Sequence, residues 1–178
     1  MSEATSRTLV AGVGNIFLTD DGFGCEVVRA LADRPVPDSV RVKDFGVSGV
    51  HLAYELLDCY DLLLIVDAAP RGREPGTVSL LEVNLDEVES GVESVSGGEM
   101  PLLDVHGMEP AAILSMLSSL GGRVDRVLLV ACEPESVEEG IGLSDVVAGA
   151  VPAAVALVEQ VVRGEHDAMK EVSSRWVG

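Results

Sequence analysis

The chain contains few aromatic residues and few basic ones. Phe, Trp and Tyr make up only 3% of its 178 residues, so its core must consist mainly of aliphatic side chains. It has 12 Lys and Arg against 30 Asp and Glu, which gives a formal net charge of −18. Such an acidic protein repels phosphate backbones and anionic lipids. We therefore expect neither a nucleic acid nor a membrane as its partner.

A disulfide framework and a long apolar run are also missing. The three cysteines, Cys25, Cys59 and Cys132, form no Cys-x-x-Cys pair, which is typical of a protein from a reducing compartment. No continuous apolar run reaches the roughly 18 residues needed to span a bilayer. Residues 1–7 are too short and too polar for a signal peptide. These features predict a cytoplasmic protein.

Strand and helix patterns alternate along the chain, which has the length of one domain with flexible ends at 1–7 and 163–178. Strands are expected at 8–13, 40–45, 62–66, 77–83 and 127–131, and helices at 24–32, 50–57, 110–120 and 144–162. This order predicts a three-layer α/β sandwich with a mostly parallel, twisted, five-stranded sheet and helices on both faces.

One connection differs from the others. The link at 68–76 is too short for a parallel crossover, so the strand that follows should be antiparallel. The acidic stretch at 84–105 then has to return to the end of the sheet where the parallel strands finish and the helix at 110–120 begins. We expect a short helix and a flap beside the site, or alternatively a surface insertion.

The glycine-rich turn at 12–24 follows the first strand, where open α/β sheets place their ligands. It begins like a dinucleotide fingerprint, but Phe17 stands at the third glycine position and no Walker lysine follows. Asp20 and Asp21 would repel a pyrophosphate. The turn therefore indicates a cation or an activated water rather than an anion.

Two further groups are expected at the same edge. Asp67 ends the strand that should lie beside the first one, and His106 immediately precedes the helix at 110–120. Asp21, Asp67 and His106 together suit divalent zinc, nickel or manganese and leave coordination positions open. Glycines around Asp21 allow another backbone to approach closely, which favours a peptide as substrate.

Four segments together resemble the nickel–iron hydrogenase maturation endopeptidases across residues 8–162. They are the turn at 12–24, Asp67-Ala68-Ala69, the loop with His106, and the Pro-Glu-Ser and Gly-Leu-Ser triplets at 134–136 and 142–144. The resemblance implies an enzyme that removes a C-terminal extension from a hydrogenase large-subunit precursor after nickel insertion. It places the metal-contacting positions of the family on Asp21, Asp67 and His106.

The resemblance also implies that the nickel belongs to the substrate, whose cysteines already hold it. We therefore expect no tightly bound metal in the resting enzyme. We also expect the enzyme to be a monomer. Asp44 and Gly46 match the family's substrate-contacting loop, although Phe45 between them does not. Water activation has two routes: nickel polarises the scissile carbonyl, or one of the carboxylates acts as base.

Three other functions are alternatives. A cysteine peptidase would use Cys132 and His106, with Glu133 orienting the histidine. A nickel-sensing chaperone would bind the precursor through the same three ligands without cutting it. A metallohydrolase acting on a small molecule is the third alternative.

Overall fold

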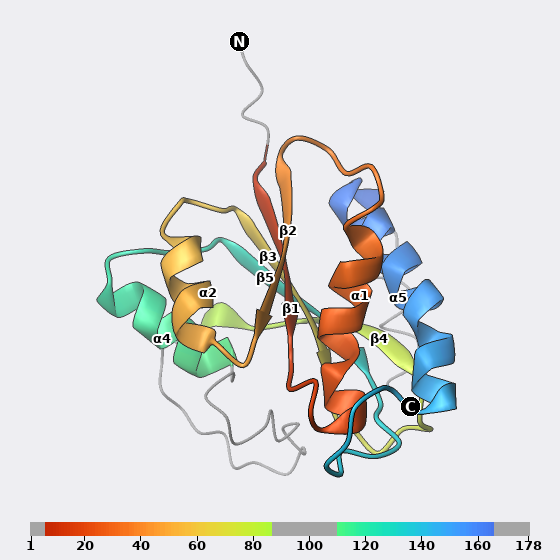
Figure 1. The fold of residues 1–178 in the computed structure, drawn as a ribbon. Coiled ribbons are helices and arrows are strands. Elements are labelled where there is room, and N and C mark those ends of the chain that lie inside the picture. The colour runs from red at the N-terminus through yellow and green to blue at the C-terminus, as the bar shows by residue number, and fades with distance from the viewer. Residues whose placement is uncertain (1–5, 87–109, 166–178) are drawn as a thin grey trace.

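The computed structural model describes residues 6–86 and 110–165, which form a five-stranded sheet between two layers of helices (Figure 1). The strands are β1 (Thr8–Val13), β2 (Val40–Gly46), β3 (Leu62–Ala68), β4 (Val78–Glu82) and β5 (Arg126–Cys132). The helices are α1 (Phe23–Leu31), α2 (Gly49–Leu56), α4 (Pro110–Ser119) and α5 (Asp145–Val162), with a short 3₁₀ helix, η1 (Thr19–Gly22). Sequence patterns predicted every element except η1 to within 2 residues at either end.

The strand order is β2-β1-β3-β5-β4, and β4 alone of these strands runs antiparallel, paired with β5. This confirms the predicted α/β class and the predicted direction of the fourth strand. The short link after β3 crosses the end of β5, where Gly76 N donates to Glu133 O at 2.8 Å and Glu133 N donates to Thr77 O at 2.9 Å. In the sheet, β5 lies between β3 and β4 and pairs with both.

The core consists of two aliphatic layers, one on each face of the sheet. Every residue of β3 is buried, and its side chains alternate between the faces. Leu64 and Val66 pack with residues of α1 and α5, whereas Leu63 and Ile65 pack with residues of α2 and α4. Figure 1 shows these two pairs of helices on opposite faces of the sheet. The low aromatic content is reflected here, because Val, Leu, Ile and Ala fill most of both layers.

Helix α5 is long and apolar enough to cross a bilayer by length and composition, with a mean hydropathy of 1.7 over 18 residues. Asp145, Glu159 and Gln160 interrupt its apolar residues, so it contains no continuous apolar run of bilayer length. One side of α5 is buried against the sheet and α1 through Val147, Ala150, Ala154, Val155, Val158 and Val161. A core helix that covers one face of a sheet satisfies the same criteria, and α5 occupies that position here.

Strands β1, β2, β3 and β5 all end at the same edge of the sheet, the lower edge in Figure 1. This edge carries the turn between β1 and α1, as expected for the ligand side of an open α/β sheet. The predicted helix and flap at 84–105 lie almost wholly outside the described residues; residues 85 and 86 are helical where that range ends.

Candidate active site

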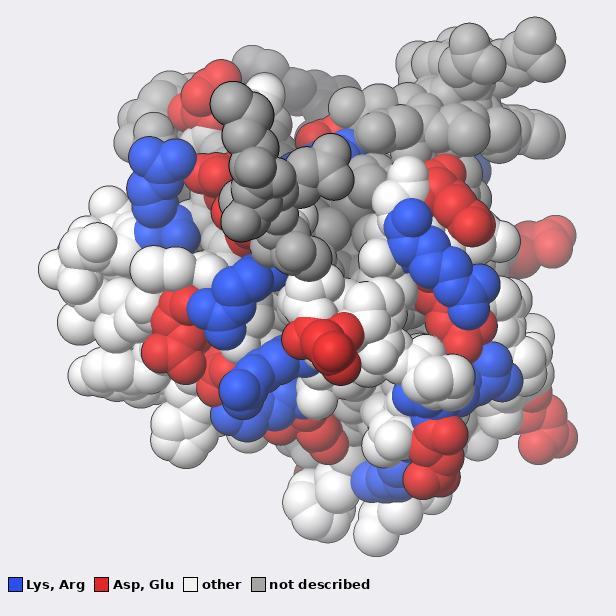
Figure 2. All heavy atoms as spheres, turned by 90° about the horizontal axis from the view of Figure 1, so that it is seen from above, with Lys and Arg blue, Asp and Glu red and all other residues white. Residues whose placement is uncertain are grey.

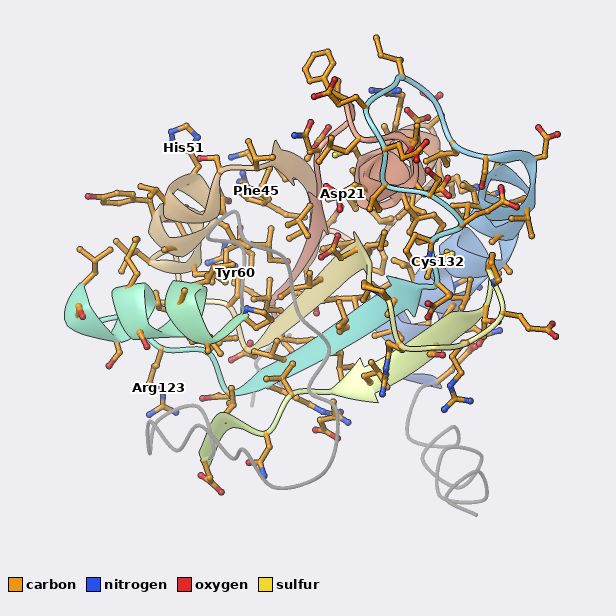
Figure 3. The ribbon with its side chains drawn as sticks, turned by 90° about the horizontal axis from the view of Figure 1, so that it is seen from below. Asp21, Phe45, His51, Tyr60, Arg123 and Cys132 are labelled. Atoms are coloured by element: carbon orange, nitrogen blue, oxygen red, sulfur yellow. The ribbon has the colours of Figure 1, made fainter. Side chains whose placement is uncertain are left out.

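The turn after β1 brings Asp21 back over the end of its own strand. Gly14 makes this possible with a φ of +133°, and a Cβ at this position would overlap the Asp21 carbonyl oxygen. Asn15 N donates to Asp21 Oδ2 at 2.8 Å, which holds the carboxylate against the turn. The Asp21 side chain therefore lies half-buried at the carboxyl end of the sheet (Figure 3).

Asp67 reaches the same point from β3. It is 9% exposed and is the next-to-last residue of its strand. A Cβ built on Gly14 would lie 3.7 Å from Asp67 Oδ1. Gly14 is also the glycine that contacts the Asp21 backbone. The Asp21 backbone and the Asp67 carboxylate thus both lie beside Gly14, at the ends of adjacent parallel strands. The part that the two carboxylates play in the reaction stays a prediction.

Asp44 and Gly46 border the same place from β2. Gly46 N donates to Asp44 Oδ1 at 2.9 Å, and Gly46 O accepts from Gly14 N at 2.9 Å. Burial, a hydrogen bond to Asp44 and the charges of Asp44 and Asp67 raise the pKa of Cys25 to about 12. Cys25 is therefore a neutral thiol, and its Sγ lies 3.6 Å from Gly14 O. The contact of Asp44 and Gly46 with substrate stays a prediction.

His106 lies outside the described residues, so its part in the site also stays a prediction. The described chain resumes at Pro110, the first residue of α4. Within residues 6–86 and 110–165, no group of three or more His, Cys, Asp or Glu side chains is arranged to hold a metal ion. The two carboxylates around Gly14 are the described part of the predicted set.

Asp20 has a different role from its neighbour, which the sequence did not reveal. Its side chain is 0% exposed and points away from the site toward the loop after β5. It accepts hydrogen bonds from Glu135 N, Ser136 N, Ser144 N and Ser144 Oγ at 2.7–3.0 Å. Burial alone would raise the pKa of Asp20, but these hydrogen bonds outweigh it and lower the pKa.

Asp20 thus connects two of the segments that carry the family resemblance. The Pro-Glu-Ser and Gly-Leu-Ser triplets supply backbone N–H groups, and Asp20 supplies the oxygens. The consecutive carboxylates and the two triplets at 134–136 and 142–144 are visible in the sequence, but nothing in it indicates that they contact each other. The buried ionised side chain is stable because several hydrogen bonds satisfy its oxygens.

The cysteine peptidase alternative is not supported by the geometry. Cys132 is 0% exposed, and burial together with the charges of Asp20 and Glu133 raises its pKa to about 12. Such a thiol stays protonated at neutral pH, whereas the thiolate is the nucleophile. Glu133 Oε2 accepts from Arg71 N at 2.7 Å, so Glu133 fixes the link between β3 and β4.

Comparisons with known proteins agree with this fold. A family model described as hydrogenase maturation protease matches residues 25–161, a range that includes Asp67 and His106 and begins shortly after Asp21. The hydrogenase 2 maturation protease of Escherichia coli is 34% identical over 164 residues, which cover 88% of this chain and 91% of that protein. A putative hydrogenase maturation protease of Methanocaldococcus jannaschii is 34% identical over 155 residues, 84% of this chain and 92% of the relative.

The structural comparison gives the same result. The solved structure of the hydrogenase maturating endopeptidase HybD from Escherichia coli superposes with a TM-score of 0.72 at 32% identity, covering 89% of this chain and 93% of that one. A hydrogenase 2 maturation peptidase from a thaumarchaeote superposes with a TM-score of 0.66 at 30% identity, covering 88% and 98%. The chain therefore belongs to the hydrogenase maturation protease family and is a peptidase.

Proposed function

We propose that this peptidase removes the C-terminal extension of a nickel–iron hydrogenase large-subunit precursor after nickel has been inserted. The observation that supports this most directly is the position of Asp21 and Asp67 on the same glycine at the carboxyl edge of the sheet. Membership of the family supplies the class of reaction and the class of substrate. The two carboxylates supply a place where a cation on that substrate can be recognised.

The donor chemistry favours an ion that arrives with the substrate. Carboxylate oxygens alone hold nickel weakly, because nickel prefers nitrogen and sulfur ligands. Cysteines of the precursor would supply the strong ligands, and Asp21, Asp67 and His106 would complete the coordination. The resting enzyme then needs no tightly bound metal. Elemental analysis of the purified protein checks this, and one zinc per chain would contradict it.

Family membership is what favours a peptide substrate. Gly14 lies half-buried, and the Asp21 carbonyl oxygen occupies the space where its side chain would be. A scissile peptide that lies near the ion is then also near groups able to accept a proton from water. We further propose that the enzyme works as a monomer in the cytoplasm and binds neither nucleic acid nor membrane, in keeping with its net charge of −18.

Mass spectrometry of the precursor tests the proposal. Purified enzyme mixed with nickel-loaded precursor should yield a product shortened by the extension. Asp21→Asn and Asp67→Asn should each slow this cleavage at least about a hundredfold, since a positioned carboxylate contributes about 10²–10⁴ in rate. Asp125→Asn, which changes an exposed carboxylate before β5, is the matched control and should cleave at the normal rate.

Two results would contradict the proposal. An unchanged precursor mass with the wild-type enzyme would favour the chaperone alternative, in which the same residues bind without cutting. Normal cleavage by both site variants would show that Asp21 and Asp67 have no part in the reaction. Circular dichroism of each variant shows whether it is folded, so that a slow rate is not confused with unfolding.

A further inference from the structure

A rigid rim borders the site on the side of the loop after β5. Two segments form it, residues 16–19 from the turn after β1 and residues 136–141 from that loop, and Leu18 and Gly140 pair as a parallel β-bridge. Gly140 N donates to Phe17 O at 2.9 Å, and Thr19 N donates to Gly140 O at 3.0 Å. The backbones of the two segments are therefore fixed to each other.

Side-chain hydrogen bonds hold the rim further. Thr19 Oγ1 donates to Ser136 O at 2.7 Å and lies 3.1 Å from Glu138 O. Asp20 accepts from the backbone of the same loop, as described above. A loop anchored at so many points has little freedom left, so whatever it presents to solvent is presented in a fixed arrangement.

This fixed rim presents large apolar side chains to solvent. Ile16, Phe17, Val137 and Ile141 are 40%, 61%, 51% and 82% exposed. We call these four residues the apolar rim. Phe17 and Ile141 adjoin the residues of the β-bridge, so they project from neighbouring points of the two segments. Ile141 and Phe17 are the two most exposed large apolar residues in the described part of the chain.

The surroundings of the apolar rim are acidic. Between residues 12 and 28, and again between 133 and 162, the sequence contains no Lys or Arg. Glu135, Glu138 and Glu139 are all exposed in the loop itself. Arg71 and Arg73, in the link after β3, are the basic residues at this edge of the sheet. Figure 2 shows further basic side chains beside acidic ones at the opposite end of the molecule. A partner for this surface would need apolar side chains flanked by Lys or Arg.

The rim is also directly connected to the site. Asn15, which precedes the apolar rim, holds Asp21 through its backbone N–H, and η1 carries both Thr19 and Asp21. In Figure 3 the loop after β5 runs beside the turn and helix next to Asp21. A protein seated on the rim therefore has its own chain within reach of the two carboxylates.

We propose that the apolar rim is the docking surface for the body of the large-subunit precursor, contacting an apolar patch flanked by basic side chains. This inference rests on the proposed function for the identity of the partner. Exposed aromatic and branched side chains on a rigid frame provide binding energy with little loss of entropy. The acidic surroundings add attraction for the basic flanks and direct the encounter.

A double variant tests the docking surface. Phe17→Ala with Ile141→Ala should raise KM for nickel-loaded precursor at least about tenfold and leave kcat within about twofold, because docking is weakened but the carboxylates are not moved. The affinity of uncleaved precursor, measured by biolayer interferometry, should fall by the same factor. Leu120→Ala is the matched control, since Leu120 is 42% exposed but follows α4 at the opposite end of the sheet.

A charge variant tests the acidic part separately. Glu138→Gln with Glu139→Gln keeps the size of both side chains and removes two charges. It should weaken binding of the precursor at low salt and flatten the salt dependence of the association rate.

The outcomes separate this inference from the proposed function. Wild-type cleavage with unchanged KM and affinity in the rim variants would overturn the docking surface and leave the proposed function standing. Binding that depends on the rim, without any cleavage, would support the surface and contradict the peptidase activity on this substrate. Self-association of wild type that the double variant abolishes, with precursor affinity unchanged, would assign the rim to a second copy of the chain and overturn the proposal.

Discussion

Asp20 and Asp21 are adjacent in sequence but have opposite roles. The Asp21 carboxylate faces the site, held by Asn15 N. The Asp20 carboxylate is enclosed by the loop after β5 and holds that loop in place. The separation arises in η1, where consecutive side chains diverge around a tight helical turn. One carboxylate therefore positions the loop after β5, while the other faces the site.

Replacing Asp20 by Asn should destabilise the protein by about 2–3 kcal/mol, because the amide carries no charge and turns an NH₂ group toward backbone donors. For a chain of this length the midpoint of thermal unfolding should fall by roughly 5–10 °C. Differential scanning calorimetry at neutral pH measures the change. Asp33→Asn alters an exposed carboxylate and should change stability by less than about 0.5 kcal/mol.

The same variant should alter the pH dependence of stability. The pKa of folded Asp20 lies below its ordinary value of 3.8, so the unfolded state binds a proton at higher pH than the folded state does. The stabilisation from Asp20 is therefore complete above about pH 4–5 and is lost as pH falls through the folded pKa. The difference between wild type and Asp20→Asn should narrow in that acidic range, and a difference that stays constant would contradict this account.

The residues of the site were predictable to the extent that topology fixes them. Asp21 follows β1 and Asp67 lies near the end of β3, and these two strands pair in parallel, so the spacing of strand patterns predicts that the two residues lie at the same edge. The hydrogen bonds of Asp20 were not predictable, because they depend on the path of a loop more than 100 residues away in sequence. Loop paths are determined by tertiary contacts rather than by local pattern.

At the scale of elements, the unit β1–η1–α1 determines where Asp21 lies. Gly24 in the first turn of α1 packs against backbone rather than side chains, so that a Cβ there would overlap the carbonyl oxygens of Val66 and Val13. This close approach lets α1 lie directly on the ends of β1 and β3. The distance between Asp21 and Asp67 thus depends on a glycine that touches neither carboxylate.

Gly24→Ala should cost about 3 kcal/mol or more despite its better helix propensity, because backbone atoms cannot move aside as side chains can. Gly149→Ala is the matched substitution, since Gly149 lies exposed in α5 with no atom within 4 Å of an added Cβ. That change should stabilise the protein by about 0.5–1 kcal/mol. Urea unfolding of both variants checks the pair, and equal effects would show that packing at Gly24 is not limiting.

The order of strands shows where sequence reasoning reaches its limit. The short link after β3 correctly indicated an antiparallel strand, because a parallel crossover needs more residues. It did not reveal that β5, formed about 50 residues later, would lie between β3 and β4. Nothing local specifies such an insertion; it follows from the burial of β5, whose residues from Val127 to Cys132 are all enclosed.

At the scale of the whole molecule, the composition fixes the type of core. With 47% hydrophobic residues and 3% aromatic ones, both layers are built from small aliphatic side chains, and two of the three cysteines take core positions beside them. Cys25 lies buried in the first turn of α1 near the site, and Cys132 ends β5. A buried thiol among aliphatic side chains behaves as a small hydrophobic group.

The reactivity of the three thiols therefore reports on the intact fold. Cys59 is exposed, whereas Cys25 and Cys132 are buried with pKa values raised to about 12. At pH 8 a disulfide reagent such as DTNB should modify one thiol per chain quickly and all three only after denaturation, because the buried pair is both protonated and enclosed. In Cys59→Ser the fast phase should disappear. Two or more fast thiols in the folded wild type would show that one side of the sheet opens readily. Loss of processing after modification of Cys59 alone would place the exposed loop between α2 and β3 in contact with the substrate.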